Sequence, residues 1–438
     1  MFTKIINSLK NINYKLFFSL LIMGLCPTIY TTLRVFYLGD LPGEWSYSIA
    51  GQLSWINLIY EIINEAILLP LFYFVGKNLL DKKEFTNKVK TGLIITLCIY
   101  ALLTILLNIF IEPLLNLMAT NSEIIEASIS YIRLESIANI FIVLSNFMLI
   151  ALVTLGKDKK VYSLTFVKLL LCMILDLFLV SSLDVSMNLG VNGIAISNII
   201  VNSGLCIFIA YLLYKEDINI FNKDKLDFKW SKEFFKIGGV SGIESFVRNF
   251  FYIVMISRMV NIVNEQGIYW VANNFIWGYL LLPITSLGEL IKQEISTSSK
   301  ALKHNTLGYF TITFIICLMW IITIPLYKPF MVHVLNYSDV DKLYNLVMIL
   351  LGFYVLYAFQ NVFDSTFYGL GKTPYMLFES VITNVIYYGI CFIFYITKLW
   401  TPSLIGIALM FGIGNAFDSI VSLGAYLYLI KKGIRNEG

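Results

Sequence analysis

The sequence predicts an all-α integral membrane protein with twelve transmembrane helices, arranged as two lobes of six helices each. Three observations lead to this fold class: a mainly apolar composition, a series of apolar tracts of membrane-spanning length, and basic residues that gather in alternate loops. Of the 438 residues, 58% are apolar and 14% are charged, whereas a soluble domain carries roughly 25% charged residues. A soluble core could not bury so large an apolar share, so we expect much of it to face lipid.

The apolar tracts define the expected spans. A helix that crosses the ~30 Å hydrocarbon core of a bilayer needs ~20 mainly apolar residues. Twelve such tracts lie between charged or turn-forming breaks, at residues 14–38, 46–74, 89–111, 127–154, 161–182, 189–214, 234–260, 268–291, 306–328, 341–368, 375–397 and 402–430. No small-residue cleavage site follows the basic amino-terminal segment, so we expect the first tract to be retained as a span.

The basic residues predict which loops face the cytoplasm. With twelve spans, the two tails and the loops on their side hold nearly all the Lys and Arg residues outside the spans. The loops on the other side hold only Lys328, Lys342 and Lys398. Because cytoplasmic loops are enriched in Lys and Arg, we expect a multi-pass protein of the inner (plasma) membrane with both termini in the cytoplasm.

Several classes of function are disfavoured by the composition. A net charge of +4 is too small to indicate a nucleic-acid partner. All six cysteines lie in apolar tracts without CxxC spacing, which argues against a metal site or a disulfide framework. The two histidines, His304 and His333, lie in loops on opposite sides of the membrane, and no Gly-rich phosphate loop appears. We therefore predict neither an enzyme nor a bound metal or organic cofactor.

A polar segment, residues 215–236, divides the chain into two halves of six spans. This segment is predicted to be a cytoplasmic linker. The predicted domains are therefore an amino-terminal lobe at residues 1–214 and a carboxyl-terminal lobe at residues 234–438, joined by a linker at residues 215–233. Because both halves start on the same side and contain an even number of spans, we expect them to be related by a pseudo-two-fold axis along the membrane normal.

Short motifs support this duplication. Residues 47–55 (YSIAGQLSW) have a counterpart at 269–277 (YWVANNFIW), and residues 193–195 (GIA) have one at 406–408 (GIA), in the same order along each half. A cavity between two such lobes is the natural path for a substrate.

The motifs also carry a resemblance to a known family. They are residues 155–158 (LGKD), 174–179 (ILDLFL), 189–196 (LGVNGIAI), 369–374 (GLGKTP) and 405–408 (IGIA). Each is weak alone, but in this order, with twelve spans, the chain resembles the multidrug and toxin extrusion (MATE) family over nearly its whole length. The larger group also holds polysaccharide and lipid flippases. The resemblance implies a monomeric, cation-coupled antiporter that rocks between inward-open and outward-open states and expels small organic compounds against a proton or sodium gradient.

The positions that match the family's coupling acids hold arginines instead. The family usually has an acid in the first span, five residues before a Gly, and another in the seventh; here these positions hold Arg34 and Arg248, with Glu244 one turn before Arg248. Two guanidinium groups that face a central cavity favour anionic groups, so the expected substrate is anionic or zwitterionic. A flippase for an anionic lipid-linked precursor is the alternative function. Two other roles remain open: an i,i+4 ion pair between Glu244 and Arg248, and a contact of Arg34 with Asp40.

An ionisable side chain in hydrocarbon costs several kcal/mol, so each one is expected to face a wet cavity or to be paired. The acids inside or at the margins of spans are Glu61, Glu65, Glu135, Asp176, Glu244, Glu289, Asp364, Glu379 and Asp418. Glu61 and Glu65, one turn apart on the second span, are the leading proton-carrier hypothesis, with a helix-helix hydrogen-bond role as the alternative. Asp364 on the tenth span comes next, because the family often places an ion-binding acid there.

Polar amides complete the candidate binding residues. Asn202 and Asn273 either line a cavity or tie neighbouring helices together, and tying is the commoner use. A membrane scaffold that transports nothing is the third function that the sequence allows.

Overall fold

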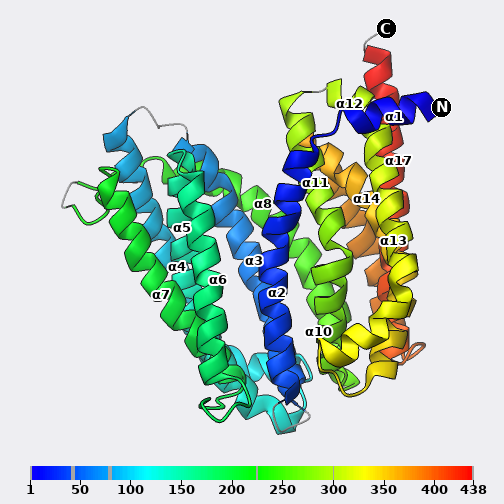
Figure 1. The fold of residues 1–438 in the computed structure, drawn as a ribbon, viewed down its shortest axis with the longest axis horizontal. Coiled ribbons are helices and arrows are strands. Elements are labelled where there is room, and N and C mark those ends of the chain that lie inside the picture. The colour runs from blue at the N-terminus through cyan, green and yellow to red at the C-terminus, as the bar shows by residue number, and fades with distance from the viewer. Residues whose placement is uncertain (1, 41–44, 77–80, 223–224, 299, 437–438) are drawn as a thin grey trace. The chain divides into compact units, whose positions relative to one another are not determined.

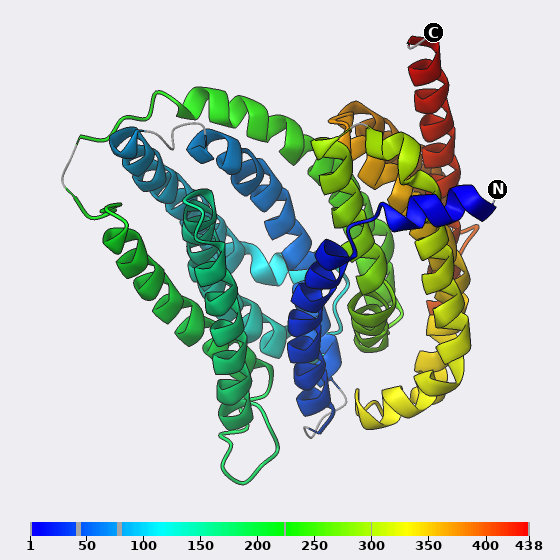
Figure 2. The same ribbon diagram turned by 45° about the horizontal axis from the view of Figure 1, so that its top comes forward.

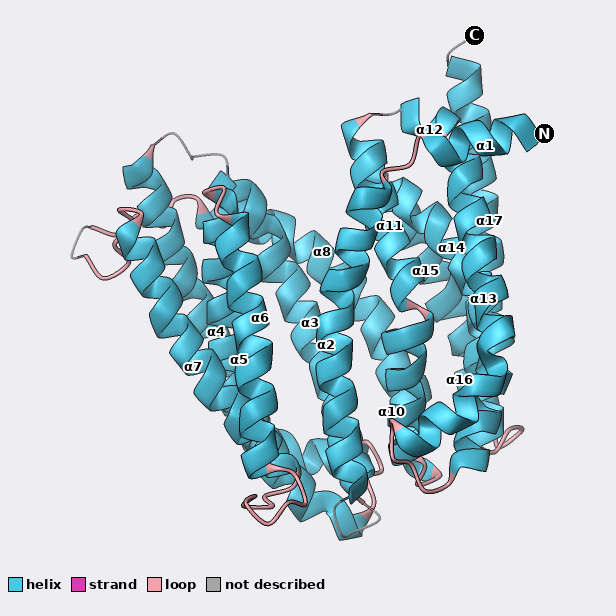
Figure 3. Ribbon diagram, viewed as in Figure 1, coloured by secondary structure: helices cyan, strands magenta, loops and turns pink. Residues whose placement is uncertain are grey.

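The fold comes from a computed structural model, which describes residues 2–40, 45–76, 81–222, 225–298 and 300–436. Within these residues every regular element is a helix and none is a strand (Figures 1 and 3). This confirms the all-α class.

The helices follow one another through the chain with short connections. Their bounds are α1 Phe2–Lys10, α2 Tyr14–Asp40, α3 Ser46–Gly76, α4 Lys82–Leu117, η1 Ser122–Ile124, α5 Ile125–Thr154, α6 Asp158–Leu179, α7 Val191–Lys215, α8 Ser231–Tyr252, η2 Ile253–Ser257, α9 Arg258–Ile262, α10 Gln266–Phe275, η3 Ile276–Leu280, α11 Leu282–Thr297, α12 Lys300–His304, α13 Thr306–His333, α14 Val340–Gly369, α15 Thr373–Val381, η4 Ile382–Tyr388, α16 Gly389–Ile396 and α17 Leu404–Asn436. η1 is a 3-10 turn, and η2, η3 and η4 are π-helical segments.

Each predicted tract falls on one continuous or bent helical stretch. In the part of the chain that the structure describes, nine helices are long and apolar enough to cross a membrane, and the bent stretch α10 to α11 makes a tenth. The other two stretches, α3 and α8 to α9, hold the charged side chains of one candidate site. Helix α4 begins earlier than its predicted tract because Asp81 caps its amino-terminal end, accepting hydrogen bonds from the Lys83 and Glu84 N–H groups.

The bend between η3 and α11 has an identifiable cause. The two segments meet at 52°, and Pro283 lies in the first turn of α11. Proline has no N–H to donate to the preceding turn, and its ring clashes with the helix before it. The π-helical turn η3 directly precedes this break, and π-helical turns are frequent at functional sites.

The described helices form two compact units. Unit 1 consists of Met1–Phe36 and Val254–Gly438, and unit 2 of Tyr37–Ile253. In unit 2, α5 packs against α4 and α7, and α3 packs against α8; in unit 1, α14 packs against α11, α13 and α17. Compared with the predicted domains, the first and seventh spans have changed places. The predicted division rests on the polar linker and on the sequence repeat, and it stays a prediction.

Small residues explain these two placements. Within unit 2, the Gly242 position of α8 lies so close to α3 that a Cβ there would be 3.0 Å from the Ala66 Cβ. Within unit 1, a Cβ at Gly24 of α2 would lie 2.4 Å from Leu282, and Thr32 of α2 hydrogen bonds to Tyr279. Close approach at small residues is a usual way for membrane helices to associate.

The amino-terminal helix is docked within unit 1. The Gly308 N–H group at the start of α13 donates to Ser8 Oγ of α1 at 2.7 Å. Figures 1 and 2 show α1 lying crosswise at the same end of unit 1 as the carboxyl-terminal end of α17. An even number of spans requires both termini to lie on one side of the membrane, in agreement with this arrangement.

Gly193 provides a test of the packing around α7. A Cβ at this position would lie 2.6 Å from the backbone oxygen of Leu179, so Gly193→Ala requires the backbone to move. We expect it to lower the free energy of unfolding by about 1–3 kcal/mol. Gly204→Ala on the same helix is the matched control, because a Cβ there meets no atom within 4 Å. Thermal unfolding of the purified variants measures the difference, and equal losses for both would contradict the packing argument.

Glu216 joins the end of α7 to the start of α6. Its carboxylate oxygens lie 2.8 Å from Lys160 Nζ and 2.9 Å from Lys157 Nζ. Hydrogen bonds from Lys160, then from Lys157, lower the pKa of Glu216 to about 2. Because the pKa is lower in the folded chain than in the unfolded one, the stabilisation is present above the unfolded pKa of about 4.3 and is lost as the pH falls from there toward 2.

The Glu216→Gln variant measures this contribution. Between about pH 5 and pH 3, we expect the melting temperature of the native chain to fall more steeply than that of the variant, which has no carboxylate to protonate. Parallel slopes over this range would show that the contact does not stabilise the fold.

Candidate functional site

Arg248 of α8 joins two glutamates of α3 within unit 2. Its Nη2 atom lies 3.1 Å from Glu61 Oε1 and 2.8 Å from Glu65 Oε1. The two glutamates lie one turn apart and therefore point to the same side of α3, against which α8 packs. One guanidinium between two carboxylates leaves an excess of negative charge. The three side chains are 28–44% exposed, so the cluster is open to its surroundings.

The structure thus brings together three side chains that the sequence had placed in two separate hypotheses. The Glu61 and Glu65 pair carries an arginine between its carboxylates. The proposed ion pair between Glu244 and Arg248 cannot be described, because the side chain of Glu244 lies outside the described residues. Proton sharing by the two glutamates stays a prediction.

Arg34 lies in unit 1, whereas Arg248 lies in unit 2. The Arg34 guanidinium carbon is 4.2 Å from the centre of the Tyr30 ring, one turn earlier on α2. This is the geometry of a cation-π contact. Asp40, the expected partner of Arg34, accepts a hydrogen bond from Ser182 Oγ at 3.1 Å in unit 2.

The two asparagines have different surroundings. Asn202 is 1% exposed and donates to the Asn198 carbonyl oxygen at 2.7 Å. Asn198 in turn donates to the buried Glu135 carboxylate of α5 at 2.7 Å. The Asn198 contact joins α5 to α7, which is the helix-tying use of membrane amides, whereas the Asn202 contact lies within α7. Asn273 is half-buried on α10.

A second group of charged residues lies in unit 1, where Asp364 of α14, Glu379 of α15 and Asp418 of α17 meet; we call these three residues the acid cluster. The Gln360 amide nitrogen donates to Asp364 Oδ2 at 3.2 Å and to Asp418 Oδ2 at 2.6 Å. The Glu379 carboxyl group lies close to those of Asp364 and Asp418 and is 3% exposed. The Gln360 amide therefore connects α14 to α17, and the proximity of the Glu379 and Asp364 carboxyl groups connects α15 to α14.

Neutral hydroxyl groups complete the acid cluster. Ser422 Oγ donates to Asp364 Oδ1 at 2.7 Å, and Thr383 Oγ1 donates to Asp418 Oδ1 at 2.6 Å. Ser419 Oγ donates to the Gln360 side-chain oxygen at 2.8 Å, which fixes the orientation of its amide. Among the described residues, no Lys or Arg forms an ion pair with the three carboxyl groups, and Glu379 Oε1 is buried without a hydrogen-bond partner.

This arrangement has the chemistry of a proton site, whereas among the described residues no three His, Cys, Asp or Glu side chains are placed to hold a metal ion. Two ionised carboxylates can only accept hydrogen bonds, so Glu379 and Asp364 can bond to each other only when one of them carries a proton. Buried carboxylates without a basic partner require a proton or another cation to offset their charge. The carboxyl groups of the acid cluster are therefore suited to hold a proton.

Sequence reasoning singled out only Asp364 from the acid cluster. A signal for the rest was present, because each of the three helices carries a polar pair at i,i+4 spacing, which places both side chains on one face. The pairs are Gln360 and Asp364, Glu379 and Thr383, and Asp418 and Ser422.

Comparisons with known proteins agree with this fold. Residues 74–178 match the family profile MatE. An inward-facing structure of a multidrug resistance MATE family transporter of the MOP superfamily is 19% identical, covers 94% of this chain and 96% of its own, and has a TM-score of 0.79. The outward-facing structure of such a transporter is 21% identical, covers 97% and 98%, and has a TM-score of 0.70.

A third structure adds a feature of its binding pocket. It is a MOP superfamily transporter from Pyrococcus furiosus, described as having a binding pocket of reverse polarity that suggests a different function. It is 20% identical, covers 97% of each chain and has a TM-score of 0.66. No curated protein sequence matches this chain. The chain is therefore a multi-pass membrane protein with the fold of the MATE transporters of the MOP superfamily, and its residues 74–178 match the sequence profile of that family.

Proposed function

We propose that this chain is a secondary active transporter that uses an ion gradient to expel small organic compounds by alternating access. Structures with the same fold have been solved in inward-facing and outward-facing conformations, which supports such a cycle. The observation that carries the proposal is the acid cluster, because one buried and two half-buried carboxyl groups without a basic partner need a cation, and a scaffold without transport has no use for such a group.

The coupling ion of the proposal is the proton, taken up at the acid cluster. The proximity of the Glu379 and Asp364 carboxyl groups supports a proton, since two such groups can share a hydrogen bond when one is protonated and repel each other when both are ionised. Gln360 links this contact to Asp418, so a change of protonation would alter the packing of α14, α15 and α17 together. A sodium ion in the same place is the competing outcome of the test.

The charge of the substrate is a separate part of the proposal. The sequence favours an anionic or zwitterionic compound because of its two arginines, and the reverse-polarity pocket described for the P. furiosus transporter shows that the polarity of the binding pocket varies within this fold. Arg248 shares its charge with two carboxylates, which lessens its contribution to such a preference. A flippase for an anionic lipid-linked precursor remains the alternative, and it requires binding of a lipid pyrophosphate that weakens in Arg34→Ala.

The remaining expectations concern the membrane, the side on which the termini lie and the oligomeric state. We place the chain in the inner (plasma) membrane, with both termini in the cytoplasm, as a monomer that contacts membrane lipid. The shared position of α1 and the end of α17 within unit 1 supports termini on one side.

Reconstitution of the full-length protein tests the proposal. Liposomes that contain the protein and a trapped pH-sensitive dye receive an imposed proton gradient, and an organic anion, a zwitterion or a cation is then added outside. We expect at least one compound to release protons from the lumen faster than in protein-free liposomes, with loss of the effect on adding a protonophore. If substrate movement persists with the protonophore but stops without sodium, the coupling ion is sodium and not the proton. If no compound moves and no lipid pyrophosphate binds, the remaining function is that of a membrane scaffold that transports nothing.

A further inference from the structure

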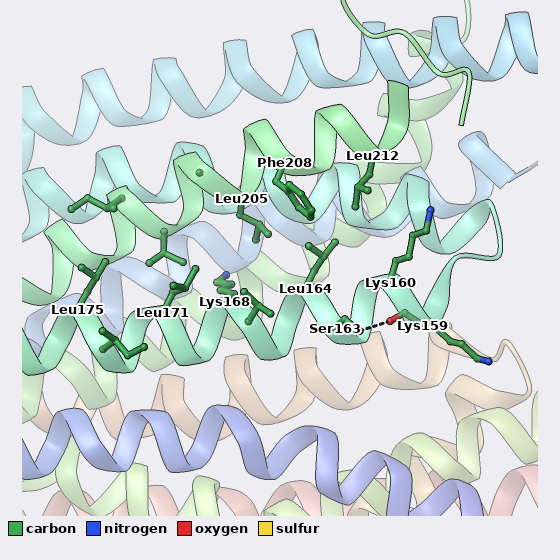
Figure 4. Close-up of a pocket in the computed structure, with 15 residues that line it drawn as sticks. Lys159, Lys160, Ser163, Leu164, Lys168, Leu171, Leu175, Leu205, Phe208 and Leu212 are labelled. Carbon is green, nitrogen blue, oxygen red and sulfur yellow. Dashed lines mark hydrogen bonds between the residues drawn. The ribbon is translucent and has the colours of Figure 1, made fainter. Parts of the chain in front are cut away.

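An apolar groove runs between α6 and α7 on the surface of unit 2. Its volume is about 880 Å³, and both helices are long and apolar enough to span a membrane. Figure 4 shows side chains of the two helices facing each other across it. They include Leu164, Leu171 and Leu175 of α6, and Leu205, Phe208 and Leu212 of α7.

The groove is open along its length. Leu171 is 47% exposed and Phe208 is 49% exposed, although both line it. Gly204 of α7 lies in the middle of the groove wall, and a Cβ added there meets no atom within 4 Å. The absence of a side chain at Gly204 therefore leaves part of the space for an occupant.

One end of the groove is basic. Lys159, Lys160 and Ser163 lie in the first turns of α6 and line this end. Lys160 is paired with Glu216 at 2.8 Å, whereas Lys159 forms no ion pair with the residues that the structure describes. Lys159 is exposed, so its charge is available to a ligand at the rim of the groove. Lys168 projects between the two helices farther along (Figure 4).

The groove is long enough to cross one leaflet of a bilayer. From Lys159 to Leu175, α6 rises about 24 Å at ~1.5 Å per residue. The hydrocarbon of one leaflet is about 15 Å thick, half of the ~30 Å core. An occupant with its charged head at Lys159 can therefore extend its apolar part along the groove through one leaflet.

We propose that this groove binds an anionic phospholipid, with one acyl chain between α6 and α7 and the phosphate at Lys159. Basic pockets between membrane helices on the cytoplasmic side are suited to anionic lipid head groups, and the groove supplies a mainly apolar surface for the chain. The α6 end that carries the lysines is on the cytoplasmic side by the distribution of basic residues, so the ligand comes from the cytoplasmic leaflet. Bound lipid would hold α6 and α7 together along their outer face.

Native mass spectrometry of the delipidated full-length protein tests the proposal, with dioleoyl phosphatidylglycerol as the anionic probe and dioleoyl phosphatidylcholine as the zwitterionic one. We expect phosphatidylglycerol to bind about five-fold more tightly, the effect of one lysine near a phosphate. Lys159→Gln should remove this preference, and Gly204→Trp should abolish the tight binding by filling the groove.

Two control variants match these changes. Lys229→Gln removes an exposed lysine elsewhere in unit 2, and Gly352→Trp adds the same side chain to a helical glycine of α14 that also has no atom within 4 Å of its Cβ position. Both should bind phosphatidylglycerol as the native protein does. If Gly204→Trp lowers the melting temperature, Gly204→Leu replaces it.

Three results would overturn the proposal. They are equal affinity for the two lipids, unchanged phosphatidylglycerol binding when Gly204 is replaced, and competition by glycerol 1-phosphate as strong as that by the whole lipid. The last result would mean that only the head group is recognised and that the groove has no part in binding.

Discussion

The Glu379→Gln variant is expected to lose proton-coupled transport in reconstituted liposomes while it still folds. Glutamine has nearly the shape of a protonated glutamate and can donate a hydrogen bond to Asp364, but it cannot release a proton. The acid cluster would then be held in its protonated arrangement throughout the cycle. We expect the rate of proton release from the lumen to fall at least about ten-fold, toward that of protein-free liposomes.

A control variant in unit 1 shows whether the loss of transport is specific to Glu379. Asp341→Asn removes an exposed carboxylate from α14, the helix that carries Asp364, at the ion pair with Lys328. We expect it to transport at the native rate. A Glu379→Gln protein that couples transport to protons as well as the native chain does would exclude the acid cluster as the coupling site, whatever the substrate.

The composition of this sequence and the lengths of its apolar tracts were sufficient to predict its long helices. Each span needs a long apolar tract, and a tract of that length is visible without knowledge of what it packs against. The prediction of such tracts depends on neighbours in the sequence alone. The break at Pro283 could not be singled out in this way, because Pro27 and Pro113 lie inside continuous helices.

The partners of the charged side chains could not be predicted in the same way. The spacing of Glu61 and Glu65 shows that they share a face of α3, but only the packing of α3 against α8 shows that Arg248 lies between them. The acid cluster needs three helices that are distant in sequence to meet at one point. Contacts of this kind depend on which small residues let helices approach, as at Gly242, and a single sequence does not reveal which pairs of helices use them.

The Arg248→Met variant is expected to destabilise unit 2 through the two glutamates that it leaves behind. Arg248 Nη2 contacts both carboxylates, and without it Glu61 and Glu65 repel each other from adjacent turns of α3. Because the three side chains are partly exposed, we expect a loss of only about 1–2 kcal/mol in the free energy of unfolding.

A double-mutant cycle isolates this interaction. Replacing Glu61 and Glu65 by Gln in the Arg248→Met protein should restore most of the lost stability, since no charge then remains without its partner, whereas the same two replacements in the native protein should be destabilising. Thermal unfolding of the four purified proteins gives the coupling energy. A purely steric role of Arg248 predicts additive effects, and a coupling energy near zero would mean that the contacts of Arg248 with the two glutamates do not stabilise the packing of α8 on α3.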